Sequence, residues 1–158
     1  MKGKSDKSDN LSGVLSDFEK SCLDTHNHYR AIHKAPALVY NKTLAAYARD
    51  YVDKQTCIWP LTPSDGPYGE NLSKGNATAY DSITTWYNEE KLYNYDSPGY
   101  FKQTKHFSQM IWKAAGQLGC AEKSCIPGSE ARGIFLMCTY DVAYNLTGFP
   151  ENVLPPAK

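Results

Sequence analysis

The stretch His106-Phe-Ser-Gln-Met-Ile-Trp112 is one of four short patterns that follow one another along this chain. The other three are His26-Asn-His-Tyr-Arg30, Gly69-Glu-Asn-Leu72, and Cys138-Thr-Tyr140 followed by Asn145. Each pattern alone is short enough to arise by chance. Four of them in this order and at suitable spacing form a specific combination, and together they decide which fold the chain is expected to adopt.

The chain around these patterns has 158 residues, with 17 Lys and Arg balanced by 17 Asp and Glu. That length suits one domain. Zero net charge argues against a protein that binds nucleic acid or anionic membranes by bulk electrostatics. A hydrophobic fraction of 41% with 22% charged residues excludes disorder as the main state. No apolar run has the ~18–20 residues that a membrane span needs. We expect a soluble packed domain that is a monomer, with a dimer as the alternative.

The order of secondary-structure patterns along the chain predicts an α+β protein. Residues 1–15 are polar and read as a flexible N-terminal lead, so the folded domain is expected to cover residues 16–158. Periodicity does not decide whether Ser108–Lys113 is a helix or a strand. The expected elements are a helix from Ser16 to about His33, a helix capped by Asn41, a long loop from Thr56 to Gly75, a helix over about Ala79–Leu92, and strands over Leu118–Ser124 and Gly133–Tyr140 joined by a Pro127-Gly128 turn. Helices first and paired strands late predict a sheet covered by helices.

Composition also points to a compartment. Five sequons in a small chain with cysteines favour secretion; they lie at Asn10, Asn41, Asn71, Asn76 and Asn145. Of these we expect glycosylation at Asn41, Asn76 and Asn145. The N-terminal residues Met1–Asp9 are polar and show no signal peptide, so either an expression start has replaced the signal or the protein stays in the cytosol. We favour a secreted, extracellular protein.

Common catalytic motifs are missing from the sequence. It contains no Gly-x-Ser-x-Gly, no His-Glu-x-x-His, no phosphate-binding glycine loop and no Cys-x-x-Cys. The spacing of Cys120, Cys125 and Cys138 does not suit a zinc finger. We therefore expect a protein that is not an enzyme.

The four patterns together resemble the CAP superfamily, which comprises cysteine-rich secretory proteins, insect antigen-five allergens and plant pathogenesis-related proteins of the first class. The stretches Gly66–Leu72, Trp86–Glu89 and Tyr93–Tyr100 are most similar to its fungal branch, the pathogen-related-in-yeast proteins. The resemblance implies a secreted three-layer α/β/α sandwich with a small antiparallel sheet between helices. The sequence departs from the family pattern at Lys105, Thr139, Val142 and Tyr144.

The resemblance implies a central cleft with two His and two Glu. By motif, this chain supplies Glu70, Glu89 and His106, but Pro63 stands where the second His is expected. Proline offers no side-chain ligand, so we expect at most a weak zinc or magnesium site and no required cofactor. The alternative is that both carboxylates only accept structural hydrogen bonds. The remaining histidines, His26, His28 and His33, are expected to be structural.

A tyrosine-rich loop follows the third helix. Tyr93, Tyr95 and Tyr100 match the aromatic-x-aromatic-x4-aromatic form that the family's caveolin-binding motif has, in a loop implicated there in sterol binding. Mobile rings can enclose a flat apolar ligand with one hydroxyl, and Pro98 with the glycine after it lets the loop bend. The alternative is that the tyrosines merely pack on the third helix. The family also implies a second channel for fatty acids, to which we assign no residues.

The resemblance implies two disulfides, Cys57 with Cys125 and Cys120 with Cys138. Cys22 has no partner in the family. Because it lies on the apolar stripe of the first helix, we expect a buried free thiol, with an intermolecular bridge as the minor alternative.

These observations favour a secreted lipid-binding and export protein that takes sterols through the aromatic loop, and fatty acids elsewhere. One alternative is a secreted virulence or defence-related interaction protein that acts on a receptor and has a degenerate cleft. Another is a metal-assisted peptidase using Glu70, Glu89 and His106. Pro63 counts against the peptidase, because no serine or cysteine nucleophile accompanies the trio.

Overall fold

The computed structural model describes residues 14–58, 60–125 and 132–157. The described part of the chain contains one four-stranded sheet in the order β1-β3-β4-β2. Its strands are β1 (Val39–Tyr40), β2 (Gly69–Lys74), β3 (Gln117–Ser124) and β4 (Ile134–Tyr140). Most of the expected lead, Trp59 of the long loop, and the Pro127-Gly128 turn lie outside the described residues.

The sheet is mixed, so the expectation of a purely antiparallel sheet is wrong at one edge. β4 pairs antiparallel with both β2 and β3, but β1 runs parallel to β3. A strand of two residues leaves too short a pattern to be recognised in a sequence. The prediction of a loop over Thr56–Gly75 is also wrong at its C-terminal end, because Gly69–Lys74 form strand β2. The two late strands are confirmed.

The helices agree closely with expectation. Ser16 and Glu19 form the expected capping box, and the side chain of Asn41 caps the second helix. The undecided segment near Ser108 is helical, and its helix begins earlier, at Lys105. The helices are α2 (Asp17–Ile32), α3 (Lys42–Asp53), α4 (Ala79–Asn88), α5 (Lys105–Ile111) and α6 (Phe149–Asn152), with short 3-10 helices η1 (Glu89–Leu92) and η2 (Lys102–Thr104).

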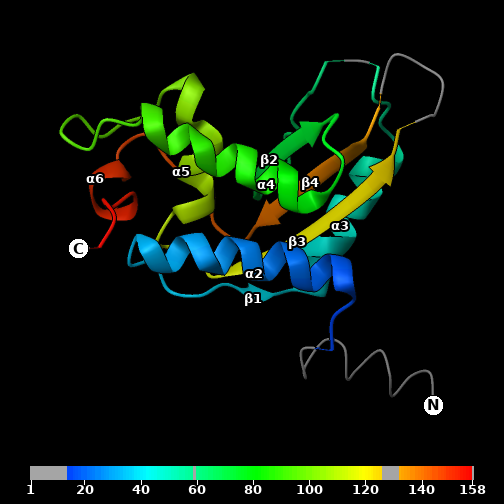
Figure 1. The fold of residues 1–158 in the computed structure, drawn as a ribbon, viewed down its shortest axis with the longest axis horizontal. Helices are drawn as coiled ribbons and strands as arrows, with labels where there is room; N and C mark the ends of the chain where they lie inside the picture. Colours follow the sequence, from blue (N-terminus) through cyan, green and yellow to red (C-terminus); the bar gives the residue numbers. More distant parts are fainter. Residues whose placement is uncertain (1–13, 59, 126–131, 158) are drawn as a thin grey trace.

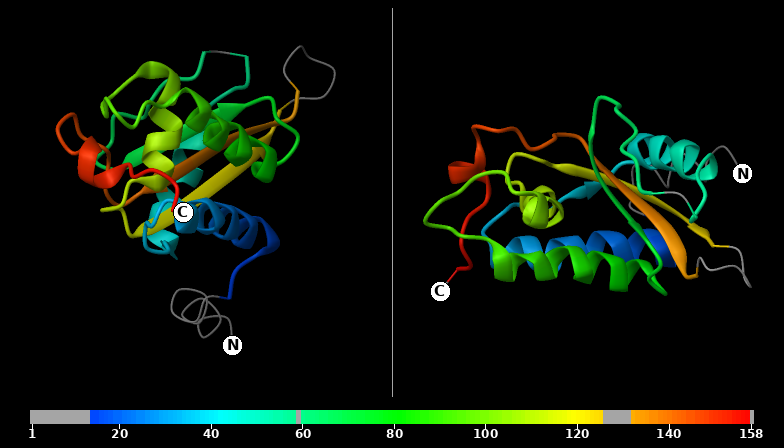
Figure 2. Two further views of the ribbon diagram at one scale, coloured as in Figure 1. Left: turned by 60° about the vertical axis from the view of Figure 1, so that its left-hand side comes forward. Right: turned by 90° about the horizontal axis from the view of Figure 1, so that it is seen from above.

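The helices form two layers around the sheet, which makes the expected α/β/α sandwich (Figure 1). Seen from above, α2 and α4 lie together below the sheet and α3 lies above it (Figure 2). Successive side chains along each strand point to opposite faces of the sheet. Leu118, Leu136 and Tyr140 belong to the larger core under α2, α4 and α5, whereas Phe135 and Met137 pack with α3. All seven residues of β4 are buried, since this strand is covered on both faces.

The start of helix α3 lies close against the sheet at Gly119 of β3. A Cβ atom built at this glycine would lie 2.1 Å from the backbone nitrogen of Ala45. Only glycine therefore allows the start of α3 to rest on the strand. The contact fixes the height of α3 above the sheet.

Beyond β1, the outer edge of β3 is closed by a side chain. The Tyr40 hydroxyl donates to the carbonyl of Cys120 at 3.1 Å and accepts from its N–H at 3.0 Å. One phenol thus satisfies the two backbone groups that a neighbouring strand would otherwise pair.

Two disulfides cross-link the fold. Cys57 is joined to Cys125 over a sequence separation of 68, and Cys120 is joined to Cys138 over a separation of 18. The first ties the segment after α3 to the end of β3, and the second joins two neighbouring strands. Cys22 is free and fully buried.

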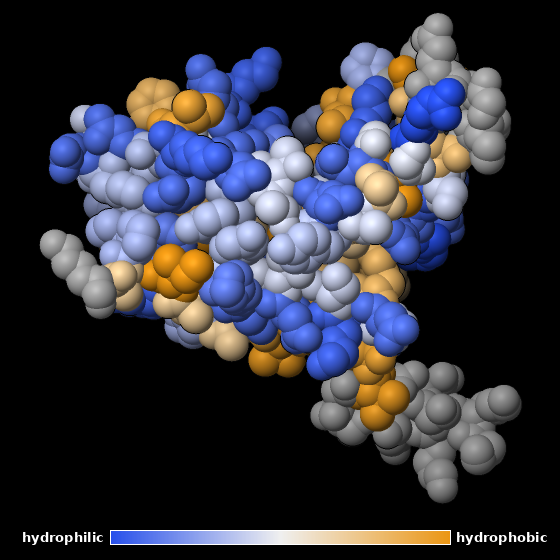
Figure 3. Space-filling view, in the orientation of Figure 1, coloured by the Kyte–Doolittle hydropathy of each residue, from blue (hydrophilic) through white to orange (hydrophobic). Residues whose placement is uncertain are grey.

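The face drawn in Figure 3 is largely polar, and apolar residues occur on it in scattered spots between polar ones. Among the described residues, no helix is both long enough and apolar enough to cross a membrane.

Candidate functional site

Arg30, the last residue of the pattern His26–Arg30, has a structural role. Its guanidinium is fully buried and donates to the carbonyls of Met110, Trp112 and Ala115 at the end of α5, and to that of Pro36. Burial lowers the pKa of Arg30 to about 10, which leaves it charged at neutral pH. The residue ties α2 to α5 and thereby positions one wall of the site.

His26 lies at the centre of a buried chain of hydrogen bonds. Its Nδ1 donates to the carbonyl of Cys22 at 2.8 Å, so Nε2 is left to accept from the Tyr140 hydroxyl at 2.6 Å. The Tyr140 oxygen in turn accepts from Asn71 Nδ2 at 3.3 Å, and Asn71 also donates to the carbonyl of His106 at 3.0 Å. The chain joins α2, β4, β2 and α5, and it gives His26 the structural role that was expected.

His33 has a similar structural role, whereas His28 is exposed on α2. The Nδ1 of His33 donates to the carbonyl of Leu154 at 2.7 Å, and its Nε2 accepts from the Tyr87 hydroxyl at 2.8 Å. Burial lowers the pKa of His33. The ring therefore links α2 to α4 and to the C-terminal segment.

Glu89 holds the start of α5. One carboxylate oxygen accepts from the N–H groups of His106 and Phe107, both at 3.0 Å, and the other accepts from His106 Nδ1 at 2.7 Å. The His106 ring is also stacked on Trp86 of α4, with 5.9 Å between ring centroids. Both oxygens of Glu89 are thus engaged within the protein.

Glu70 is engaged by a different segment. Its oxygens accept from the N–H and the hydroxyl of Ser64, at 2.7 Å and 2.5 Å. The Ser64 hydroxyl oxygen also lies 2.7 Å from the hydroxyl of Tyr47 on α3. Glu70 therefore holds the loop before β2 against the sheet, as the structural alternative for this carboxylate anticipates.

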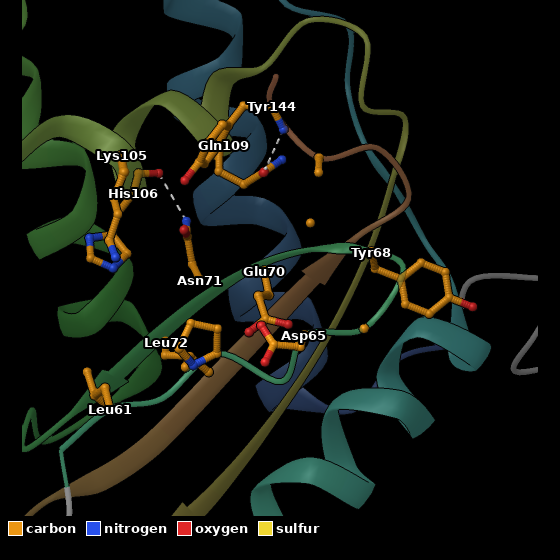
Figure 4. A pocket seen from close by; sticks show the side chains of 14 residues that line it. Leu61, Asp65, Tyr68, Glu70, Asn71, Leu72, Lys105, His106, Gln109 and Tyr144 are labelled. Carbon is orange, nitrogen blue, oxygen red and sulfur yellow. Dashed lines mark hydrogen bonds between the residues drawn. The ribbon is translucent and has the colours of Figure 1, made fainter. Parts of the chain in front are cut away.

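A pocket of about 390 Å³ is lined by Glu70 and by His106, the partner of Glu89. Figure 4 shows Glu70 on β2 and His106 on α5 as parts of different walls. Polar and apolar side chains both line the pocket. The polar ones are Asp65, Glu70, Asn71, Lys105, His106 and Gln109, and the apolar or aromatic ones are Leu61, Pro63, Tyr68, Leu72, Ala143 and Tyr144. Its volume falls within the ~300–1,000 Å³ typical of small-molecule sites.

Gln109 is a site residue that sequence reasoning did not single out. Its Nε2 donates to the carbonyl of Val142 at 2.9 Å, and its Oε1 accepts from the N–H of Tyr144 at 3.1 Å (Figure 4). One buried amide thus fixes the segment that forms the pocket's far wall. Its place within the stretch His106–Trp112 was the available signal.

The three expected metal ligands are not assembled into one metal site. In the described ranges, the only three His, Cys, Asp or Glu residues whose ligand atoms lie within 4.8 Å of one another are Cys22, Cys120 and Cys138. Glu70, Glu89 and His106 are not such a group, and Pro63 adds no ligand. Two of the three cysteines form a disulfide, which leaves no set of thiolates there either.

The tyrosine loop is packed more closely than a freely moving loop would be. Tyr93 is buried against Phe107, with ring centroids 5.6 Å apart, and Tyr95 donates its hydroxyl to Glu90 at 2.8 Å. The Tyr93 hydroxyl lies by the Gly99 backbone but makes no hydrogen bond of normal geometry. Pro98 and Tyr100 are exposed, and the Tyr100 ring contacts Tyr144 at 5.7 Å. The end of the loop therefore adjoins the pocket wall.

The sequons differ in accessibility. Asn145 is exposed, Asn76 is partly buried and donates to Ser73, and Asn71 is buried within the chain from His26 to His106. Asn41 caps α3 with its oxygen and donates its amide to Gln117. Among the described sequons Asn145 is thus the exposed one, and its side-chain oxygen accepts from Thr147 of the same sequon. Asn10 lies outside the described residues.

The comparisons with known proteins agree with this fold. The cysteine-rich secretory protein family, CAP, matches residues 23–140. The chain is 43% identical over 143 residues to protein PRY2 of Saccharomyces cerevisiae, covering 89% of this chain and 42% of that protein. It is 36% identical over 168 residues to secreted protein RBT4 of Candida albicans, covering 98% of this chain and 46% of that one.

Solved structures show the same fold. The venom allergen-like protein 4 of Schistosoma mansoni superposes with a TM-score of 0.68 at 21% identity, over 91% of this chain and 97% of that one. Fold and sequence together define a CAP domain. The chain belongs to the cysteine-rich secretory protein family and is related to the fungal pathogen-related proteins. It spans less than half the length of these two fungal relatives.

Proposed function

We propose that this chain is a secreted carrier of small lipids that binds a sterol where the aromatic loop meets the pocket. The observation that carries the proposal is the contact between Tyr100 of the loop and Tyr144 of the pocket wall. This contact makes one continuous aromatic surface from the loop to a cavity of about 390 Å³. A rigid apolar ligand gains most of its binding energy from such surface.

The polar end of a sterol is a single hydroxyl, and the loop offers a partner for it. The Tyr93 hydroxyl is buried without a good hydrogen bond. A buried polar group without a partner carries a cost that a ligand hydroxyl can remove. Bending of the loop at Pro98 would expose this phenol, while Tyr100 and Phe101, which are already exposed, would cover the ring system. Fatty acids remain the second class of ligand, at a site to which we assign no residues.

The experiment is equilibrium binding of radiolabelled cholesterol and ergosterol to the pure protein. We expect saturable binding that Tyr100→Ala weakens and that Tyr93→Phe, which removes only the hydroxyl, also weakens. Tyr80→Ala is the matched control, because Tyr80 is an exposed tyrosine on α4 outside the loop. Absence of saturable binding in the parent protein would overturn the proposal. Fatty-acid binding that ignores all three substitutions would assign that ligand to another site.

A second candidate function is a secreted interaction protein that acts on a receptor through a cleft that has lost its ligand chemistry. Two observations favour it. Pro63 stands where the family pattern has a metal-binding histidine, and every carboxylate oxygen of Glu70 and Glu89 accepts a hydrogen bond from a protein group. The same observations support a protein that is not a metal-assisted peptidase and needs no cofactor. Binding of labelled protein to cells of a candidate host, unchanged by Tyr100→Ala, would favour this second function over lipid carriage.

Secretion is part of the proposal. Two disulfides and the exposed Asn145 suit an oxidising compartment with glycosylation machinery. Expression of the full-length protein in a eukaryotic host, followed by glycosidase treatment of the medium, tests this point. A protein that stays in the cells with reduced cysteines would contradict secretion.

A further inference from the structure

Three sulfur atoms gather beneath helix α2, on the sheet face that α2 covers. The sulfurs of Cys22, Cys120 and Cys138 all lie within 4.8 Å of one another. The last two are joined, and Cys22 is free with no exposed surface. The arrangement is a thiol next to a disulfide.

Such an arrangement has a defined chemistry. A thiolate attacks one sulfur of a disulfide, forms a bond to it and expels the other sulfur as a thiolate. The Cys22 sulfur lies within 4.8 Å of both bridged sulfurs, so a new bridge to either could replace the old one. No oxidant is required, because one disulfide is consumed for each one made.

The folded protein keeps this thiol inactive. Burial raises the pKa of Cys22 far above its usual value, and the carboxylates of Glu122 and Glu19 raise it further. Because only the thiolate is a nucleophile, Cys22 does not start the exchange by itself. The reaction must begin with a thiol from outside.

A route for such a thiol leads to Cys120. A second pocket, of about 370 Å³, lies between the N-terminal part of α2, the first turns of α3 and the edge of β3, and Cys120 is among its lining residues. Cys120 retains 4% of its surface, whereas Cys138 in the central strand retains none. A pocket of this volume can hold a low-molecular-weight thiol.

We propose that Cys120 is a modification site for low-molecular-weight thiols and that Cys22 is the resolving thiol that completes a disulfide exchange. In the first step the incoming thiolate bonds to the Cys120 sulfur, and Cys138 leaves as a thiolate. In the second step the Cys138 thiolate takes the proton of Cys22, whose sulfur lies within 4.8 Å of it. The Cys22 sulfur then bonds to Cys120, and the small thiol leaves as a thiolate. The product carries a Cys22–Cys120 bridge and a free Cys138, with no net oxidation.

The exchange changes what the bridge connects. The Cys120–Cys138 bridge joins two strands that are already hydrogen-bonded neighbours. A Cys22–Cys120 bridge joins α2 to the sheet instead. The exchange leaves Cys57–Cys125 untouched, because neither sulfur belongs to the cluster.

The test follows the free thiol. The folded protein is incubated with β-mercaptoethanol, quenched with acid, labelled with N-ethylmaleimide in denaturant, digested and examined by mass spectrometry. We expect the label to shift from Cys22 to Cys138 and a cross-linked Cys22–Cys120 peptide to accumulate, with neither Cys57 nor Cys125 in the new cross-link. A label that stays on Cys22, or that spreads over all five cysteines, would overturn the proposal.

Two variants separate the steps. Cys22→Ala removes the resolving thiol, so the adduct of β-mercaptoethanol on Cys120 should persist and no new internal bridge should form. Ala46→Met narrows the pocket at an exposed helical position and should slow the label shift in a protein that keeps all its cysteines. An unchanged rate in Ala46→Met would overturn the proposed route, whatever the folding of Cys22→Ala.

Discussion

Tyr140 donates its hydroxyl proton to Nε2 of His26 across 2.6 Å, while the other ring nitrogen of His26 donates to the carbonyl of Cys22. Both nitrogens of a fully buried imidazole are therefore committed, one as donor and one as acceptor. A second proton on the ring would force the Tyr140 hydroxyl to turn and accept, which would leave the hydroxyl proton without its present acceptor. Burial accordingly lowers the pKa of His26 to about 4.

This pairing predicts acid sensitivity. The unfolded chain binds a proton on His26 below pH 6.5, but the folded protein does not until about pH 4. Stability is therefore complete above 6.5 and falls as pH drops through that window, by roughly 3 kcal/mol. His33, whose pKa burial also lowers, adds to the same trend.

Urea unfolding between pH 7.5 and 4.5 measures the slope, and NMR titration of the His26 ring identifies its source. The NMR experiment is decisive, because the raised pKa of Glu122 works in the opposite direction on stability. A His26 ring that titrates near 6.5 in the folded protein would contradict the prediction.

Replacing Arg30 should destabilise the fold strongly even when charge is kept. In Arg30→Lys an ammonium cannot reach four carbonyls on three segments, so several buried acceptors lose their donors. We expect a loss of about 3 kcal/mol in urea unfolding. Arg49→Lys on the exposed face of α3 is the matched control and should cost less than about 1 kcal/mol. Equal effects of the two substitutions would disprove the bridging role of Arg30.

The two cleft carboxylates should behave differently when removed. Glu89→Ala deletes three hydrogen bonds that start α5, so we expect about 2–3 kcal/mol of lost stability. Glu70→Ala releases the loop around Ser64 and should speed amide hydrogen exchange there with a smaller global cost. Urea unfolding and hydrogen exchange on both variants check the contrast. The prediction fails if Glu70→Ala destabilises α5 as much as Glu89→Ala does.

Removal of the Cys57–Cys125 disulfide should lower the stability of the fold more than removal of Cys120–Cys138. In the chain-entropy description, a bridge over a separation of 68 contributes about 4 kcal/mol, against about 3 for a separation of 18. The double variant Cys57→Ser with Cys125→Ser should therefore unfold at markedly lower temperature. Thermal unfolding of the oxidised parent and the variant measures this. A change of less than about 1 kcal/mol would show that the unfolded chain is already constrained in this region.

Metal affinity should depend on position 63. Because the parent gathers no three-ligand set at the cleft, we expect zinc titration by calorimetry to show no sub-micromolar site there. Pro63→His supplies an imidazole at the pocket that His106 and Glu70 also line and should raise zinc affinity by at least roughly tenfold. Thr62→His is the control, since Thr62 does not line the pocket. Tight zinc binding by the parent would falsify the role given to Pro63.

The sequence predicts the long elements of this fold because their signals are local. The capping box at Ser16 and the cap at Asn41 lie next to periodic apolar residues, and both helices begin there. β1 was missed because two residues carry no periodicity, and its parallel pairing with β3 joins residues distant in sequence. β2 was missed because its polar residues Asn71 and Ser73 are buried by partners distant in sequence.

The site was predictable in its residues but not in its geometry. Motifs identify Glu70, Glu89 and His106, yet nothing local reveals that Ser64 occupies one carboxylate and the start of α5 the other. The packing of Tyr93 beneath Phe107 is likewise a property of two segments that meet in space. Gln109 shows the same limit, because a glutamine within a helix does not announce that it holds the segment around Tyr144.

The phenol of Tyr40 at the outer edge of β3 has a consequence for how copies of this protein meet. An open strand edge is a template on which another chain can add a strand, and such addition leads to aggregates. Here the N–H and the carbonyl of Cys120, which an added strand would pair with, already bond to the Tyr40 hydroxyl. Further along the strand, Arg49 donates to the carbonyl of Glu122. Side chains therefore occupy these backbone groups at the β3 edge. A second copy of the protein finds fewer free donors and acceptors there for adding a strand, even at high concentration.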